Sequence, residues 1–223
     1  MPSTVHDLPK VDPQQVSDFA GNNGFRDLVP ADGNLRAVQD RRPETARLGI
    51  WVAFAAIIMS FAALTSALVV RQGSGIDWGH LVLPPILYLN TLLLLASSGT
   101  LEIARRSIAG SARGSSTQIT IPVLWLLATL ALGLLFVGGQ YEAWRQLKAQ
   151  GLYLATNPNS SFFYVFTGLH AVHVFGGLLG LLYVISKLYR SILRQSTFNA
   201  ASQYWHFMGL LWLYLLFLLW IKL

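Results

Sequence analysis

The sequence predicts an all-α integral membrane protein with five transmembrane helices. Of its 223 residues, 53% are apolar and only 12% are charged, which is too little charge to cover a soluble domain of this size. Five uncharged apolar runs each reach the length of about 18 residues that can span a bilayer. The net charge of +6 is spread between these runs rather than gathered in one patch with aromatic residues, so nucleic acid is not an expected partner.

The charged and polar residues between the apolar runs set the limits of the spans. We expect the spans at residues 48–70, 81–101, 119–139, 161–186 and 204–221. Arg47 and Arg71 bound the first span, and Glu102 ends the second. A polar RGSSTQ stretch precedes the third, while Lys187 and Lys222 follow the fourth and fifth. Prolines, which fit the first turn of a helix, stand near the start of the second and third spans at Pro84, Pro85 and Pro122.

Lysine and arginine predict the orientation, because cytoplasmic loops carry an excess of both. The N-terminal side carries twelve, namely Lys10, Arg26, Arg36, Arg41, Arg42, Arg47, Arg105, Arg106, Arg113, Lys187, Arg190 and Arg194. The opposite side carries four, namely Arg71, Arg145, Lys148 and Lys222. Without the remote Lys10 and Arg26 the excess is still ten to four. We therefore expect a cytoplasmic N-terminus and a C-terminus outside, in the periplasm of a bacterium.

Residues 1–46 are expected to form a flexible cytoplasmic tail ahead of a membrane domain at residues 47–223. The tail is polar, with Pro, Gly, Asn and Asp scattered through it and no sustained helical period. No apolar stretch near its start resembles a signal peptide, so the first span is expected to direct membrane insertion.

Several classes of catalytic site have no support in the sequence. Cysteine is absent, which excludes disulfides, Cys-ligated zinc, iron–sulfur clusters and thiol catalysis. No carboxylate lies within the five apolar runs, since Glu102 and Glu142 stand at span ends, so paired carboxylates for a di-metal or hydrolytic site are missing from the membrane. The chain also lacks an internal repeat, a Gly-rich phosphate loop and a nucleophile elbow, so neither a transporter nor a hydrolase is indicated.

The histidines are the remaining candidates for ligands. His170 and His173 are three residues apart, which predicts one shared helix face, at a depth of roughly 14 to 18 Å from the outer end of their span. His206, counted from Tyr204 at the cytoplasmic end of the last span, is expected to lie much shallower. This difference disfavours a haem held by two histidines without eliminating it. The alternative is that each imidazole bonds a carbonyl or hydroxyl of a neighbouring helix.

Small residues predict close helix packing and hydrogen bonds between helices. They are Ser97 to Thr100, Gly138, Gly139, Gly168, Gly176, Gly177 and Gly180. The residues alone therefore indicate a packed five-helix membrane protein without a catalytic site of its own.

Four phrases in the last four spans, taken in order, resemble subunit III of the haem-copper respiratory oxidases. They are LNTLLLLASSGTLEIARR, LGLLFVGGQYEAW, FFYVFTGLHAVHVFGG and YWHFMGLLW. The third is similar to the TGxHGxHV signature of that family, and the fourth is similar to its WHFVD helix. The resemblance covers about residues 47–223 and matches the shorter, five-helix form of cytochrome c oxidase subunit III.

The resemblance implies a subunit without catalytic, cofactor-binding or metal-binding residues of its own. It implies that haem and copper reside in partner subunits. It also implies that the chain packs directly against oxidase subunit I, with subunit II and other respiratory subunits as further partners. The implied roles are to bind structural phospholipids, to support proton uptake and to protect the catalytic centre. By the family pattern, structural roles are implied for Ser97, Ser98, Gln140, Thr167, Gly168, His170, His173, Gly177, Tyr204, Trp205 and His206. Lys187 and Arg47 are implied lipid-headgroup contacts, with ordinary positive-inside charge as the alternative.

The sequence also departs from the family pattern. Ile57 stands where the family usually has a buried glutamate, and Gly209 replaces the aspartate of the WHFVD phrase. Ala171 replaces the glycine between the two histidines, and the glutamate expected near Trp144 comes early as Glu142. Loss of two buried carboxylates indicates an interior network replaced by apolar packing, which puts in doubt any role that needs a titrating group inside this subunit.

The function expected from residues and resemblance together is that of a non-catalytic subunit III of a terminal oxidase in a bacterial inner membrane. Three alternatives stay open at this point. The first is a related subunit of a quinol oxidase or an accessory protein of nitric oxide reductase. The second is a membrane cytochrome b anchor that uses His170 or His173 with His206, and the third is a small-solute transporter.

Overall fold

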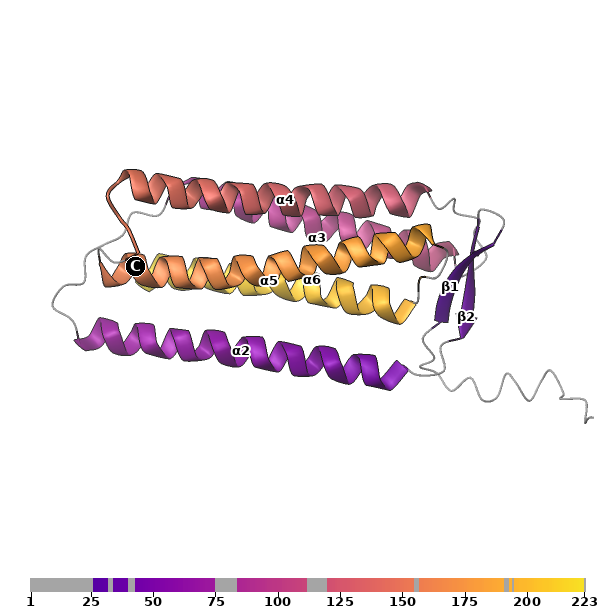
Figure 1. The fold of residues 1–223 in the computed structure, drawn as a ribbon, viewed down its shortest axis with the longest axis horizontal. Helices are drawn as coiled ribbons and strands as arrows, with labels where there is room; N and C mark the ends of the chain where they lie inside the picture. The colour runs from indigo at the N-terminus through magenta and orange to yellow at the C-terminus, as the bar shows by residue number, and fades with distance from the viewer. Residues whose placement is uncertain are drawn as a thin grey trace, which may run out of the picture.

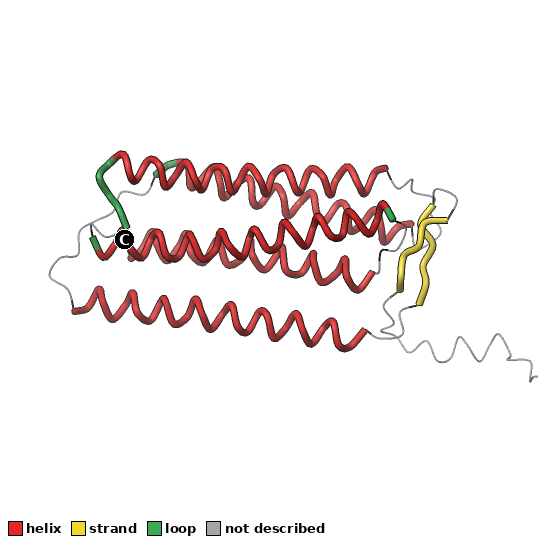
Figure 2. Tube along the Cα trace, in the orientation of Figure 1, coloured by secondary structure: helices red, strands yellow, loops and turns green. Residues whose placement is uncertain are grey.

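Five long helices make up the membrane domain. The computed structural model describes residues 26–31, 34–39, 43–74, 84–111, 120–154, 157–190, 193 and 195–222. The helices are α2 (Pro43–Ser74), α3 (Ile86–Ser111), α4 (Thr120–Ala149), α5 (Pro158–Tyr189) and α6 (Gln195–Lys222). Each contains a stretch long and apolar enough to cross a membrane, so the predicted number of spanning helices is confirmed. Successive helices run up and down along one bundle (Figure 1 and Figure 2).

Most of the helices extend beyond the apolar runs that predicted them, whereas α3 begins at Ile86, five residues after the expected start of its span. α3 continues past Glu102 because this carboxylate pairs with Arg105 at 2.7 Å and with Arg106 at 3.0 Å, one turn further along the same helix. α4 likewise continues to Ala149, and Glu142 pairs with Arg145 at 3.2 Å. A charge therefore ends the apolar run but not the helix.

The last helix differs most from its predicted start. α6 begins at Gln195, nine residues before Tyr204, where the expected span began. Apart from Phe198, the added residues are small or polar, and none carries a charge; Phe198 and Ser202 are buried. The prediction counted only strongly apolar residues and so missed the first turns of this helix.

A two-stranded antiparallel hairpin precedes the helices. It consists of β1 (Arg26–Ala31) and β2 (Asn34–Gln39), with Ala31 paired to Asn34 and Arg26 paired to Gln39. The hairpin lies within the segment 1–46, at the end of the bundle where α2 begins (Figure 1). The flexibility expected for this segment stays a prediction.

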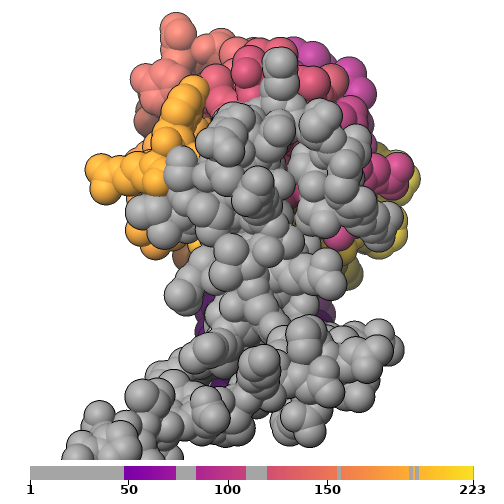
Figure 3. Space-filling model, turned by 90° about the vertical axis from the view of Figure 1, so that its right-hand side faces the viewer, coloured from indigo at the N-terminus to yellow at the C-terminus, as the bar shows by residue number. Residues whose placement is uncertain are grey.

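The helices do not pack equally. α3 and α4 share the most extensive contact, α5 and α6 lie against each other, and α2 contacts only α6 and, sparsely, α5 among the described helices. The span in α2 is accordingly 17% buried, against 44% for the span in α6. Seen along the bundle from the hairpin end, α5 lies on the left and α3 and α6 on the right (Figure 3). α2 therefore leaves most of its apolar surface to lipid or a partner.

Candidate functional site

His170 lies inside the bundle against aromatic rings. Its side chain is completely buried, and its ring centroid is 5.1 Å from that of Trp212 in α6 and 5.9 Å from that of Phe136 in α4. Neither ring nitrogen has a hydrogen-bond partner among the described residues. The expectation that this imidazole bonds a carbonyl or hydroxyl of a neighbouring helix is therefore wrong.

His173 faces another part of the bundle. Its ring centroid is 6.0 Å from that of Phe61 in α2, and its Nδ1 is 2.7 Å from the carbonyl oxygen of Leu169, one turn back on its own helix. The hydrogen bond to a neighbouring helix is made by its backbone instead, where Tyr204 in α6 donates its hydroxyl to the His173 carbonyl at 3.0 Å. The His170 ring thus contacts α4 and α6 and the His173 ring contacts α2, although their spacing places both on one side of α5.

His206 stands further along its helix than the sequence predicted. Because α6 begins at Gln195, His206 stands eleven residues into the helix, where the charges of Glu102 and Arg105 at the end of the second apolar run still act on it. His206 follows Tyr204 by two residues. The Tyr204 hydroxyl bonds the His173 carbonyl, so Tyr204 and His173 lie at similar levels of the bundle. The described residues nevertheless contain no group of three or more acidic or histidine side chains that could hold a metal ion. A haem held by two histidines gains no support, since the His170 and His173 rings pack against Trp212 and Phe61.

Tryptophan indoles connect the helices through hydrogen bonds to small hydroxyls. Trp205 Nε1 donates to Ser97 Oγ at 3.0 Å, joining α6 to α3, and both side chains are at most 1% exposed. Trp144 Nε1 donates to Thr167 Oγ1 at 3.0 Å and joins α4 to α5. The sequence indicated Ser97, Thr167 and Trp205 as structural residues, and the structure supplies their partners.

Two further connections involve threonines, of which the sequence indicated only Thr100. Trp212 Nε1 donates to Thr91 Oγ1 at 3.0 Å, and the hydroxyls of Thr100 and Thr129 are 2.8 Å apart. Threonines on apolar helices appear at many positions, so only their three-dimensional neighbours distinguish these from the rest.

Glycines allow close packing at some of the predicted positions. A Cβ added at Gly177 would lie 3.1 Å from the Trp205 ring and 3.2 Å from Tyr204, and one added at Gly139 would overlap the amide of Asn90. By contrast, no described atom lies within 4 Å of a Cβ added at Gly168. The predicted close approach therefore holds at Gly139 and Gly177.

Gly133 is the tightest contact that the sequence analysis did not single out. A Cβ there would lie 2.7 Å from the Trp205 ring and 2.8 Å from Leu178. It stands among leucines in α4, with no neighbouring glycine to mark it.

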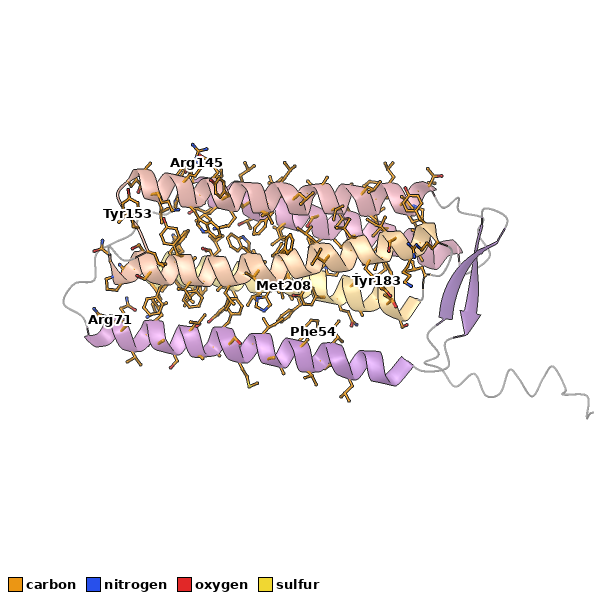
Figure 4. The ribbon with its side chains drawn as sticks, in the orientation of Figure 1. Phe54, Arg71, Arg145, Tyr153, Tyr183 and Met208 are labelled. Carbon is orange, nitrogen blue, oxygen red and sulfur yellow. The ribbon has the colours of Figure 1, made fainter. Side chains whose placement is uncertain are left out.

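The positions that depart from the family pattern have different surroundings. Ile57 is buried at 7% exposure, and a Cβ at Gly209 would lie in ordinary contact, 3.5 Å from the hydroxyl of Ser98. Glu142 is partly exposed and pairs with Arg145, whose side chain points outward from the bundle in Figure 4. Among the residues whose side chains the structure describes, the two acidic ones, Glu102 and Glu142, both pair with arginine on their own helix.

The lipid-headgroup candidates lie at one end of the bundle. Lys187 is half-buried near the end of α5, and its Nζ is 5.4 Å from the centre of the Tyr183 ring (Figure 4). Arg47 belongs to the first turns of α2, at the same end, but its side chain lies outside the described part. The two positions share a level but have no contact that the structure describes.

Two buried amides complete the interior. Gln140 in α4 is 1% exposed and Asn90 in α3 is not exposed at all, yet neither amide has a hydrogen-bond partner among the described residues. Gln140 was indicated by the family pattern. Asn90 was missed, although a lone asparagine four residues into a membrane helix is itself a signal.

Comparison with known proteins agrees with this architecture. A family model described as cytochrome c oxidase subunit III matches residues 48–222 and so covers all five spans. The quinol oxidase subunit 3 of Bacillus subtilis is 30% identical over 192 residues, which cover 82% of this chain and 91% of the relative. A probable cytochrome c oxidase subunit 3 of Mycobacterium tuberculosis is 30% identical over 183 residues, covering 77% of this chain and 85% of the relative.

A third relative extends the match further along the chain. The cytochrome c oxidase subunit 3 of Thermostichus vulcanus is 30% identical over 214 residues, which cover 86% of this chain and 96% of the relative. The four phrases of the last four spans, the five-helix bundle and the matches along most of both chains agree with one another. The chain belongs to the cytochrome c oxidase subunit III family.

Proposed function

We propose that this chain is the non-catalytic subunit III of a terminal oxidase in a bacterial inner membrane, packed directly against subunit I. The observation that carries the proposal is the family match from residue 48 to residue 222, which includes every membrane helix. The relatives are named as third subunits of cytochrome c oxidases and of quinol oxidases at equal identity, so they support the class of complex and leave its electron donor open. Haem and copper belong to the partner subunits in this proposal.

The interior of the bundle supports an indirect role in proton uptake. Ile57 and Gly209 occupy the positions where the resemblance leads one to expect buried carboxylates, and Ile57 is packed in the apolar core. A proton relay needs groups that exchange protons, and a core of this kind supplies none at those positions. The chain would therefore act on proton uptake by supporting the structure of subunit I.

Lipid binding is the second part of the proposed role. Lys187 stands at the end of α5, where a long cationic side chain can reach the headgroup level, and Arg47 opens the first span at the same end. α2 contacts little else in the chain, which leaves apolar surface on both sides of it for acyl chains or a partner helix. We infer that phospholipid bound here helps to hold the subunit in the complex.

The proposed orientation places the N-terminal end of α2 in the cytoplasm. That end carries the excess of Lys and Arg, which cytoplasmic loops favour. Because the chain lacks cysteine, one introduced at Ser115 and another at Gln150 would be the sole thiols of their variants. An impermeant maleimide added to intact spheroplasts should label Gln150→Cys and leave Ser115→Cys unlabelled, and the reverse pattern would overturn the orientation.

The experiment that tests the function is purification of the tagged chain from native membranes in mild detergent. Its visible spectrum should show haem, and a haem-bearing subunit I should co-purify in equal amount. The companion subunits would then identify the electron donor as cytochrome c or quinol. A chain that comes out alone and colourless would overturn the oxidase assignment, and one that comes out alone with a haem spectrum would favour the cytochrome b alternative.

A further inference from the structure

We propose that Asn90, Gln140 and His170 bind internal water in the centre of the helix bundle. The three side chains come from α3, α4 and α5, and their exposed fractions are 0%, 1% and 0%. Both polar atoms of each side chain lack a hydrogen-bond partner among the described residues. Buried polar groups are normally hydrogen-bonded, so three such groups on facing helices indicate a ligand between them.

The contacts between α4 and α5 place Gln140 beside His170. Phe136, one turn before Gln140, packs its ring 5.9 Å from that of His170. Trp144, one turn after Gln140, bonds Thr167, which is three residues before His170. Gln140 therefore stands on the α4 face that meets α5, between two contacts that flank His170.

The contacts of α3 and α6 bring Asn90 to the same level. The Asn90 amide lies directly against Gly139, the residue before Gln140. Its neighbour Thr91 accepts a hydrogen bond from Trp212 at 3.0 Å, and the Trp212 ring packs 5.1 Å from that of His170. Four helices thus converge on one layer that contains all three unpartnered side chains.

The chemistry of the three groups fits water better than an ion. Each amide offers donors and an acceptor, and a neutral imidazole offers one of each. A water molecule also donates and accepts, and buried waters typically make about three hydrogen bonds. Glu142, the described charged residue nearest to Gln140 in sequence, is partly exposed and pairs with Arg145, so it offers no counter-charge to an ion bound here.

Polar groups also lead from this layer toward the α4–α5 connection. The Tyr164 hydroxyl donates to the carbonyl of Leu152 at 2.9 Å, and Trp144 and Thr167 form the next pair toward the interior. Beyond that pair come Gln140 and then His170. These polar groups would give the proposed water a route along the contact between α4 and α5. The route leads to the end of the bundle where the chain passes from α4 to α5.

A cryo-EM map of the chain in its native complex, at a resolution that shows ordered water, tests the proposal directly. We expect a compact density within hydrogen-bond distance of Gln140, His170 and Asn90. Direct contact between an amide and the imidazole with no density between them would overturn the proposal, and so would density of an ion or of a lipid. The proposal does not depend on the oxidase function, because the density is sought inside this chain, whatever subunits purify with it.

Solid-state NMR provides a second readout on the chain reconstituted in bilayers and labelled with nitrogen-15 in histidine. Polarisation transferred from water protons should reach the His170 ring, whose signal is assigned by its loss in His170→Phe. The double variant Asn90→Leu, Gln140→Leu should lower that transfer severalfold while the ring remains.

The matched control is Ser97→Ala, because Ser97 is equally buried but already bonded to Trp205. It should leave the transfer to His170 unchanged. No transfer to His170 in the native chain, or an equal loss in Ser97→Ala, would contradict the water site. If the double variant fails to insert, the native chain alone still decides the question.

Discussion

Trp205 and Ser97 are hydrogen-bonded across the centre of the bundle, with the indole nitrogen 3.0 Å from the hydroxyl oxygen. The Trp205 ring also packs against Gly133 in α4 and Gly177 in α5. One side chain of α6 therefore contacts α3, α4 and α5. The residue thus fixes the relative positions of four helices. Changes on either side of this contact should report on the stability of the whole domain.

Ser97→Ala should destabilise the bundle, because the Trp205 N–H would be left buried without an acceptor. The cost should be about 1 to 3 kcal/mol. It is measured as the loss of the folded chain on titration with denaturing detergent in mixed micelles. The double variant with Trp205→Phe should be no less stable than Trp205→Phe alone, since the donor is then gone, and additive losses would contradict the bond.

Gly133→Leu and Gly177→Leu should prevent correct packing of α6. Both positions lie against the Trp205 ring. The nearest ring atom would be 2.7 Å from a Cβ added at Gly133 and 3.1 Å from one added at Gly177. The expected result is a large drop in the yield of assembled complex from membranes. Gly168→Leu is the matched control, because no described atom lies within 4 Å of a Cβ added there. Equal yields in all three variants would show that this packing is not required.

The hydrogen bond lost in Tyr204→Phe should lower the stability of the folded bundle more than the one lost in His173→Leu. The first removes the bond from α6 to the His173 carbonyl, whereas the His173 ring bonds only a carbonyl of its own helix among the described groups. Interhelical bonds in membranes average about 0.6 kcal/mol. Neither change should alter a haem spectrum of the purified complex, and a spectral loss in the isolated chain would support a ligand role instead.

Lys187→Gln should reduce the phospholipid that stays with the chain, because the cation at the end of α5 is the proposed headgroup contact. Native mass spectrometry of the purified complex measures the retained lipid. Lys148→Gln, an exposed lysine at the opposite end of the bundle, is the control and should retain the native amount. Equal retention in both variants would favour ordinary positive-inside charge at Lys187.

Deletion of residues 1–40 should leave membrane insertion intact, although it removes both strands of the hairpin. α2 begins at Pro43 and contains the first span, which carries the apolar length needed for insertion. Fractionation of membranes with carbonate extraction checks this outcome. A truncated chain that stays out of the membrane would give the N-terminal segment a role in targeting.

The sequence predicted the number of helices and the family from local features of the chain. Apolar runs between charges identify spans, because a backbone in lipid must satisfy its hydrogen bonds within a helix. The limits were less accurate where charged residues pair within a helix, as Glu102 does with Arg105, or where polar residues start one, as before Tyr204 in α6. Hydropathy does not register either effect.

The surroundings of each side chain were decided by tertiary structure. From their spacing, His170 and His173 were expected to share a face of their helix. The angle between the two side chains about the helix axis is still large enough that His170 meets Trp212 and His173 meets α2. Nothing in the sequence distinguished Gly133 and Thr91 from their neighbours, although both make close contacts with a tryptophan of α6. The rotation and register of each helix determine such contacts, and both are set by how all five helices pack together.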